Sequence, residues 1–121
     1  MKSRKDVLIM DDDPAIVEAL SLMLEDAGYT IRTLDEREIL ETLAENLPGV
    51  LLLDIWLSGK DGRTICRDLK SQPATRNLPI ILMSANSDIQ RIAKESGADD
   101  YLAKPFSMKE LVTKVEKYLA S

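Results

Sequence analysis

The sequence contains no histidine and only one cysteine, Cys66. Without histidine, catalysis by a Ser–His or Cys–His pair is excluded. The usual zinc sites, which are built from several cysteine and histidine ligands, are excluded for the same reason. One cysteine cannot form an internal disulfide, as we expect of a protein from the reducing cytoplasm. Any chemistry must therefore depend on carboxylates, hydroxyls and lysine.

A long apolar run is also missing, and basic residues are not in excess. A transmembrane helix needs about 20 consecutive apolar residues, so we expect no membrane partner. The 16 Lys and Arg residues are outnumbered by 21 Asp and Glu residues, which gives a net charge of −5. Because nucleic acid binding requires a basic surface, we expect no direct binding of nucleic acid by this domain. The 121 residues, of which 45% are hydrophobic, predict one domain over residues 1–121 with no output domain.

Two apolar runs that end in acidic residues are the most informative feature of the sequence. Val7–Met10 is followed by Asp11 and Asp12, and Val50–Leu53 is followed by Asp54. If both runs are buried parallel strands, these carboxylates meet at one edge of a sheet. Neighbouring carboxylates repel one another unless a cation or a proton relieves the repulsion. The pattern therefore predicts a magnesium site beside a reactive aspartate.

Apolar runs and helical spacings alternate along the rest of the chain. After Asp13, an N-cap candidate, and Pro14, a first-turn residue, apolar positions recur at helical spacing. Strands are predicted at 7–10, 30–34, 50–53, 79–83 and 101–103, and helices at 14–27, 39–44, 65–69, 89–93 and 108–119. Residues 58–62 are interpreted as a loop. We interpret the charges of Arg63, Arg67 and Lys70, on the third helix, as a solvated face.

This succession of five strand–helix units predicts an α/β fold in which helices cover both faces of a parallel sheet. The first, third and fourth runs are apolar throughout, so we place them in the middle of the sheet. The second run alternates and the fifth is short, so both are expected at the edges. The doubly wound strand order 2-1-3-4-5 satisfies these placements. Such sheets bind ligands beyond the carboxyl ends of the strands, here near strands one and three.

Four short motifs follow four different predicted strands. They are Asp11-Asp12, Asp54, Ser84-Ala85 and Lys104-Pro105. With these motifs in this order, essentially the whole chain resembles the receiver domain of two-component response regulators. The resemblance implies a single flavodoxin-like (βα)5 domain. It also implies a signalling module, not an enzyme with a metabolite as substrate, because receivers catalyse only their own aspartyl phosphorylation and dephosphorylation.

The resemblance assigns the phosphoacceptor and the metal ligands. Asp54 accepts a phosphoryl group from a phosphohistidine on a sensor histidine kinase or a histidine phosphotransfer protein. Mg²⁺ is held directly by Asp12, Asp54 and the backbone carbonyl of Trp56, and by Asp11 largely through a bound water. Magnesium prefers one or two carboxylates together with water and phosphate oxygens, which agrees with this set.

The resemblance also assigns the groups that sense the phosphoryl group. Lys104 pairs with one phosphoryl oxygen, and Ser84, followed by Ala85, hydrogen-bonds another. These contacts draw in the loop after strand four, and Tyr101 moves from exposed to buried rotamers. The face formed by helix four, strand five and helix five then signals to a downstream protein or an attached output domain, or forms a phosphorylation-dependent homodimer. The Lys104-Pro105 bond is expected to be cis.

Other interpretations and two departures from the family pattern accompany this assignment. A pseudo-receiver that binds proteins without phosphorylation, and a small hydrolase with an aspartate nucleophile, are the competing functions. Residues 57–62 read Leu-Ser-Gly-Lys-Asp-Gly, where many receivers have Met-Pro-Gly-x-Asp-Gly. In the family, side chains at the positions of Trp56 and Asn86 flank the path of attacking water, so a bulky Trp56 is expected to shield the acyl phosphate. The sequence names neither the kinase nor the target, and fits both a stand-alone regulator and part of a longer protein.

Overall fold

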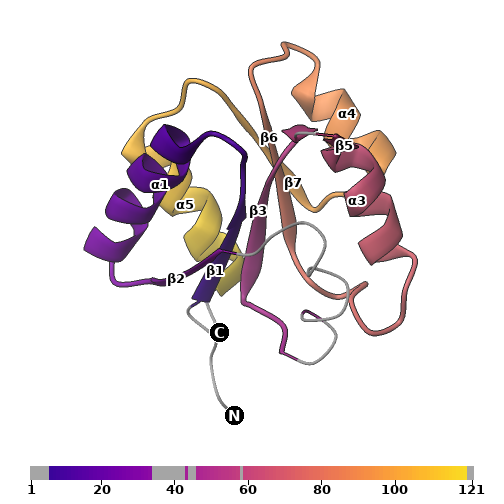
Figure 1. Ribbon diagram of the computed structural model, residues 1–121, viewed down its shortest axis with the longest axis horizontal. Coiled ribbons are helices and arrows are strands. Elements are labelled where there is room, and N and C mark those ends of the chain that lie inside the picture. Colours follow the sequence, from indigo (N-terminus) through magenta and orange to yellow (C-terminus); the bar gives the residue numbers. More distant parts are fainter. Residues whose placement is uncertain (1–5, 34–42, 44–45, 58, 120–121) are drawn as a thin grey trace.

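The computed structural model describes residues 6–33, 43, 46–57 and 59–119. Its main sheet contains β1 (Asp6–Met10), β2 (Thr30–Thr33), β3 (Val50–Asp54), β6 (Ile80–Ser84) and β7 (Asp100–Ala103). The helices are α1 (Pro14–Asp26), α3 (Gly62–Lys70), α4 (Ile89–Ser96) and α5 (Met108–Leu119). The five strands are parallel and run in the order β2-β1-β3-β6-β7, which confirms the predicted topology (Figure 1). The helix predicted at 39–44 lies outside the described residues except for Leu43, which is helical and buried.

Helices cover both faces of the sheet, with α1 and α5 on one side and α3 and α4 on the other (Figure 1). Successive strand side chains point to opposite faces, so Val7 and Ile9 pack toward α1 and α5, and Leu8 and Met10 pack toward α3. Every residue of β3 and β6 is buried, whereas β2 and β7 are partly exposed. The central and edge positions predicted from the apolar runs are therefore confirmed.

The turn that leads from β1 into α1 is fixed by local capping. The Asp13 side chain accepts a 3.0 Å hydrogen bond from the Ala15 N–H, and Pro14 is the first helical residue. The Asp13 N–H in turn donates a 2.9 Å hydrogen bond to Asp11 Oδ1. The sequence signals for this helix start are confirmed, and they place Asp11 and Asp12 directly beyond the end of β1.

Two local interpretations of the sequence are wrong. The region predicted as a loop, 58–62, contains a short strand, β5 (Lys60–Asp61), which pairs antiparallel with β4 (Trp56–Leu57) just before it. Lys70 does not lie on a solvated face, because its Nζ donates to the Leu78 carbonyl at 2.8 Å and pairs with Asp99 at 2.6 Å. Its side chain is only 17% exposed.

Cys66 lies on α3 and has no exposed surface. Burial raises the pKa of its thiol to about 11. The single cysteine is therefore part of the hydrophobic core, as the position on the apolar side of the helix indicates.

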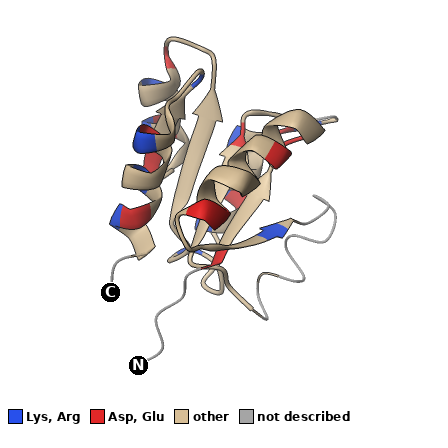
Figure 2. Cartoon of the chain, turned by 90° about the vertical axis from the view of Figure 1, so that its left-hand side faces the viewer, with Lys and Arg blue, Asp and Glu red and all other residues tan. Residues whose placement is uncertain are grey.

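The two helices on one face of the sheet, α1 and α5, differ in their charged residues (Figure 2). The charged residues of α1 are all acidic, whereas α5 carries both lysine and glutamate along its length. No helix in the described part of the chain combines the length and apolar character that a membrane crossing requires.

Candidate functional site

Three side chains from distant parts of the chain meet at the carboxyl ends of the parallel strands. Asp11 follows β1, Asp54 ends β3, and Lys104 follows β7. The Lys104 Nζ atom lies 3.0 Å from Asp11 Oδ2 and 3.2 Å from Asp54 Oδ1. One ammonium group thus joins two carboxylates that are separated by more than forty positions in the sequence.

These three side chains are largely shielded from solvent. The exposed fractions are 3% for Asp11, 11% for Asp54 and 21% for Lys104. Charges that are removed from water in this way interact more strongly than surface charges, and they must be paired. The cluster is therefore a charged site built into the edge of the sheet, not a group of surface ion pairs.

Burial and charge shift the acid–base properties of both ends of the Lys104–Asp54 pair. Burial raises the pKa of Asp54; the Lys104 ammonium opposes this effect, and the Asp11 carboxylate adds to it. For Lys104, burial acts to lower the pKa, but the hydrogen bond to Asp11 and the charges of Asp54 and Asp11 outweigh it and raise the pKa. Lys104 is therefore firmly cationic, and a second cation beside Asp54 would favour its ionised form.

The end of β6 lies next to this cluster. Ser84 is 3% exposed, and its carbonyl accepts a 2.9 Å hydrogen bond from the Lys104 N–H. Its hydroxyl oxygen accepts a 3.0 Å hydrogen bond from the Asn86 N–H, so the hydroxyl proton can be donated elsewhere. Ala85 and Asn86 are exposed beyond the strand end. The Lys104-Pro105 peptide bond is cis.

Asp12 and Trp56 stand at the rim of the cluster. Both residues are exposed, and the exposed fraction of Trp56 is 65%. The guanidinium of Arg63 lies 5.7 Å from the Trp56 ring centroid, and it forms a two-pronged ion pair with Asp61. Within the described residues, no three acidic, cysteine or histidine side chains gather as a metal cluster. The structure brings Asp11 and Asp54 together through Lys104, and Asp12 is exposed next to them in the sequence.

Tyr101 is separate from the cluster and lies on the edge strand β7. Its half-buried ring packs against the core beneath α3 and α4. From α5, the Lys114 Nζ atom approaches the ring centroid to 4.0 Å and also pairs with Asp100 at 2.8 Å. Tyr101 therefore contacts both the core beneath α3 and α4 and the Lys114 side chain of α5.

Most of the chain matches a known protein family. Residues 7–116 match the response regulator receiver domain family. The chain belongs to this family. Receivers of this kind are signalling modules rather than conventional enzymes.

The relatives of this receiver include transcriptional regulators. The chain is 38% identical over 116 residues to the DNA-binding dual master transcriptional regulator RpaA of Synechocystis. That match covers 93% of this chain but 48% of RpaA, so the receiver spans about half the length of this relative.

Solved structures with the same fold include two receiver domains of sensor kinases. The signal receiver domain of a signal transduction histidine kinase from Syntrophus aciditrophicus is 33% identical, with a TM-score of 0.86 and coverage of 96% of this chain and 90% of that chain. The receiver domain of a sensor histidine kinase from Pseudomonas aeruginosa is 27% identical, with a TM-score of 0.85 and coverage of 98% and 100%. The latter was solved with a magnesium ion coordinated in its active-site cleft.

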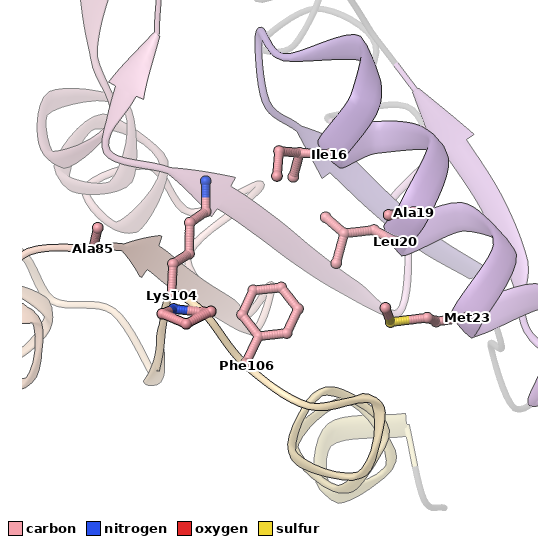
Figure 3. Close-up of a pocket in the computed structure, with 8 residues that line it drawn as sticks. Ile16, Ala19, Leu20, Met23, Ala85, Lys104 and Phe106 are labelled. Carbon is pink, nitrogen blue, oxygen red and sulfur yellow. The ribbon is translucent and has the colours of Figure 1, made fainter.

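An apolar groove beside the receiver's charged cluster was not anticipated from the sequence. Its volume is about 340 Å³, and we call it the α1 groove. The groove is lined by Ile16, Ala19, Leu20, Met23, Ala85, Lys104, Pro105 and Phe106. Figure 3 shows side chains of α1 facing Phe106 across it, with the Lys104 nitrogen pointing away from Phe106. The sequence did contain one signal for this groove. One side of α1 has more apolar residues than the core covers, because only Leu20 and Leu24 of this helix are buried.

Proposed function

We propose that the chain is a phosphoacceptor receiver in a two-component or phosphorelay pathway, and that Asp54 accepts the phosphoryl group. The observation that carries the proposal is the Lys104 ammonium held 3.2 Å from the Asp54 carboxylate in a chain of the receiver family. The donor is a phosphohistidine on a sensor histidine kinase or a histidine phosphotransfer protein. This chemistry belongs in the cytoplasm, where such donors act.

The transfer step uses the residues that meet at the strand ends. An Asp54 carboxylate oxygen attacks the phosphorus atom and forms a new O–P bond, while the P–N bond to the donor histidine breaks. The electron pair of that bond stays on the imidazole nitrogen. Lys104, already firmly cationic, pairs with one phosphoryl oxygen, and the Ser84 hydroxyl donates a hydrogen bond to another. Positioning of the reacting groups and neutralisation of their charge supply most of the rate acceleration.

The donor set at the site fits Mg²⁺. Asp11 and Asp54 present two shielded carboxylates beside one another, since both lie within 3.2 Å of the same nitrogen. Magnesium takes one or two carboxylates together with waters and phosphate oxygens, so a cluster of three acidic side chains is not required. Asp11, Asp12, Asp54 and the Trp56 carbonyl would hold the ion. When bound, Mg²⁺ neutralises the charge that accumulates on the phosphoryl oxygens.

The α1 groove supports a protein as the phosphoryl donor. It adjoins the site directly, because the stem of Lys104 forms part of its wall (Figure 3). Apart from that lysine, the residues that line it are apolar. A donor protein that brings its phosphohistidine to Asp54 must cover the neighbouring surface, and an apolar groove offers contact area that a small phosphodonor would not use.

Phosphorylation is proposed to act on a partner through a population shift. Ser84 and Lys104 lie at the ends of β6 and β7, and their backbones are joined by a 2.9 Å hydrogen bond. A phosphoryl group that binds both side chains favours one arrangement of these strand ends, and Tyr101 on β7 reports it. The face of α4, β7 and α5 then meets a downstream protein, an attached output domain or a second phosphorylated copy.

The deciding experiment titrates Trp56 fluorescence with Mg²⁺ and then adds acetyl phosphate while the intact mass is recorded. Trp56 is the only tryptophan and lies two residues after Asp54, so it should report both events. We expect a Mg²⁺-dependent change in emission and the mass of one added phosphoryl group. Asp54→Asn should accept no phosphoryl group, whereas Asp68→Asn, at an exposed position of α3, should behave as the wild type.

A different outcome would favour the competing role. If the wild-type chain neither responds to Mg²⁺ nor gains mass, the proposal is wrong and a phosphorylation-independent interaction scaffold becomes the better interpretation. The search would then turn to proteins that bind wild type and Asp54→Asn equally well.

A further inference from the structure

Gly62, the first residue of α3, lies directly against the backbone of Asp54. A Cβ atom at position 62 would stand 2.2 Å from the Asp54 carbonyl oxygen and 3.0 Å from Ile55 Cα. Real Cβ atoms essentially never approach backbone atoms as closely as the first of these distances. The Gly62 N–H also donates a 2.7 Å hydrogen bond to the Ile55 carbonyl. The start of α3 and the end of β3 are therefore in contact, backbone to backbone.

Glycine is required at position 62 for space and not for its backbone angle. The glycines with positive φ are Gly28, Gly59 and Gly97, and Gly62 is not among them. Gly28 is the opposite case, because its φ is +96° and an added Cβ would meet nothing within 4 Å. An alanine strains the backbone at Gly28, but it collides with Asp54 at Gly62. A comparison of alanine variants at these two glycines therefore distinguishes a general loss of stability from a specific effect on the site.

A methyl group at position 62 would press on the Asp54 backbone from a helix start that is itself held in place. The first turn of α3 is fixed by the Asp61 side chain, which accepts a 2.9 Å hydrogen bond from the Arg63 N–H. Ile65 and the following apolar residues of α3 are buried in the core. Asp54 is the last residue of β3, opposite Met83 of β6, and its carbonyl is the atom that the added methyl group would meet first.

The described residues on either side of position 58 contact one another beside the proposed phosphoacceptor. Trp56 and Leu57 of β4 pair with Asp61 and Lys60 of β5, and the Gly62–Ile55 hydrogen bond lies next to these pairs. We propose that Gly62 is a positioning residue for phosphoryl transfer, because its missing side chain lets the start of α3 lie against the Asp54 backbone and so hold the Asp54 carboxylate in place beside Lys104. This inference rests on the function proposed for Asp54.

The test compares Gly62→Ala with Gly28→Ala in the 121-residue chain. Thermal unfolding, Mg²⁺ affinity from Trp56 fluorescence, and the rate constant for phosphorylation by acetyl phosphate at saturating Mg²⁺ are measured for each. Both variants should lose stability. Gly62→Ala should be phosphorylated roughly a hundredfold more slowly, since a displacement of about 1 Å has an effect of this size, and should bind Mg²⁺ more weakly. Gly28→Ala should stay close to the wild type in rate and affinity.

A crystal structure of Gly62→Ala supplies a readout that does not depend on activity. The Lys104 Nζ–Asp54 Oδ1 distance should exceed its present 3.2 Å, while the Lys104–Asp11 distance of 3.0 Å is kept. If Gly62→Ala is partly unfolded in buffer, trimethylamine N-oxide raises the folded fraction, and each rate constant is divided by that fraction.

Two results would overturn the inference, and they differ from each other. If Gly62→Ala matches Gly28→Ala in rate and Mg²⁺ affinity, Gly62 has no positioning role, although the proposed function stands. If the wild-type chain accepts no phosphoryl group at all, both the inference and the proposed function are wrong.

Discussion

The ammonium group of Lys114 lies 4.0 Å from the centroid of the Tyr101 ring. The same nitrogen pairs with Asp100 at 2.8 Å, so one side chain of α5 holds two consecutive residues of β7. Lys114 is 27% exposed, and the contact is therefore partly shielded from water. The edge strand that carries the proposed switch residue is thus fastened to α5 by a lysine.

Replacing Lys114 by glutamine should lower the free energy of unfolding by about 1 kcal/mol, because a cation–π contact and a partly shielded ion pair are both lost. Lys117→Gln is the matched control, since Lys117 is 66% exposed and reaches Asp100 only at 3.7 Å. Urea denaturation measures both variants. Equal losses in the two would contradict a specific role for the Lys114–Tyr101 contact.

Asp54→Asn should stabilise the fold at neutral pH, and the gain should vanish in acid. Burial raises the pKa of Asp54 above its ordinary value of 3.8, so the folded chain binds this proton more tightly than the unfolded chain does. The resulting penalty for ionising Asp54 is absent below 3.8, grows as the pH rises toward the raised pKa, and is complete above it. Asparagine cannot ionise, so the substitution removes the penalty at neutral pH and has no such effect in acid, where Asp54 of the wild type is protonated.

Urea denaturation of wild type and Asp54→Asn across a pH series measures this difference. Asp68→Asn, at an exposed position of α3, should follow the wild type at every pH. If the gain in stability for Asp54→Asn is largest in acid, the pKa of Asp54 is not raised by folding and the prediction is wrong.

Trp56→Asn should shorten the lifetime of the acyl phosphate several-fold. The ring lies two residues after Asp54 and is kept beside the Arg63 guanidinium, so it can hinder water that approaches the phosphoryl group. The lifetime is measured by intact mass after acetyl phosphate is removed. Lys60→Asn, an exposed change in the same hairpin, should leave it unaltered. An unchanged lifetime in Trp56→Asn would rule out shielding by the ring.

Ala19→Glu should slow phosphorylation by a protein donor without slowing phosphorylation by acetyl phosphate. Ala19 lines the α1 groove, and a carboxylate there opposes an apolar contact. The probe is an autophosphorylated histidine kinase or phosphotransfer protein that phosphorylates the wild-type chain. Ala15→Glu places the same charge on an exposed part of α1 outside the groove. If both variants respond alike to both donors, the groove does not receive the donor protein.

The sheet could be predicted because its strands are marked by composition as well as by pattern. β3 and β6 need cover on both faces, and their uninterrupted apolar residues indicate this without any knowledge of the partners. Once the strand order followed, the meeting of Asp11, Asp54 and Lys104 followed too, since each lies at a carboxyl end. The sequence did not indicate that Asp11 is shielded while Asp12 is exposed. That choice depends on the turn into α1, where the Asp13 N–H binds Asp11 Oδ1 at 2.9 Å.

The features that escaped prediction depend on contacts between distant residues or on very short elements. Two-residue strands such as β4 and β5 are too short to show a periodic pattern. Lys70 looked like a surface charge because its partner, Asp99, lies 29 positions away. Helical spacing showed that Ile16 and Ala19 share the apolar side of α1, but not that the sheet leaves part of that side uncovered as a groove.

The buried thiol of Cys66 has a practical consequence for following this receiver in solution. Its pKa of about 11 keeps it protonated at neutral pH, and the core keeps reagents away from it. A second cysteine placed at an exposed position, such as Ser87 on the loop after β6, would therefore be the only one to react with a fluorophore or spin label. Motions of that loop can be recorded site-specifically while the native cysteine stays in place.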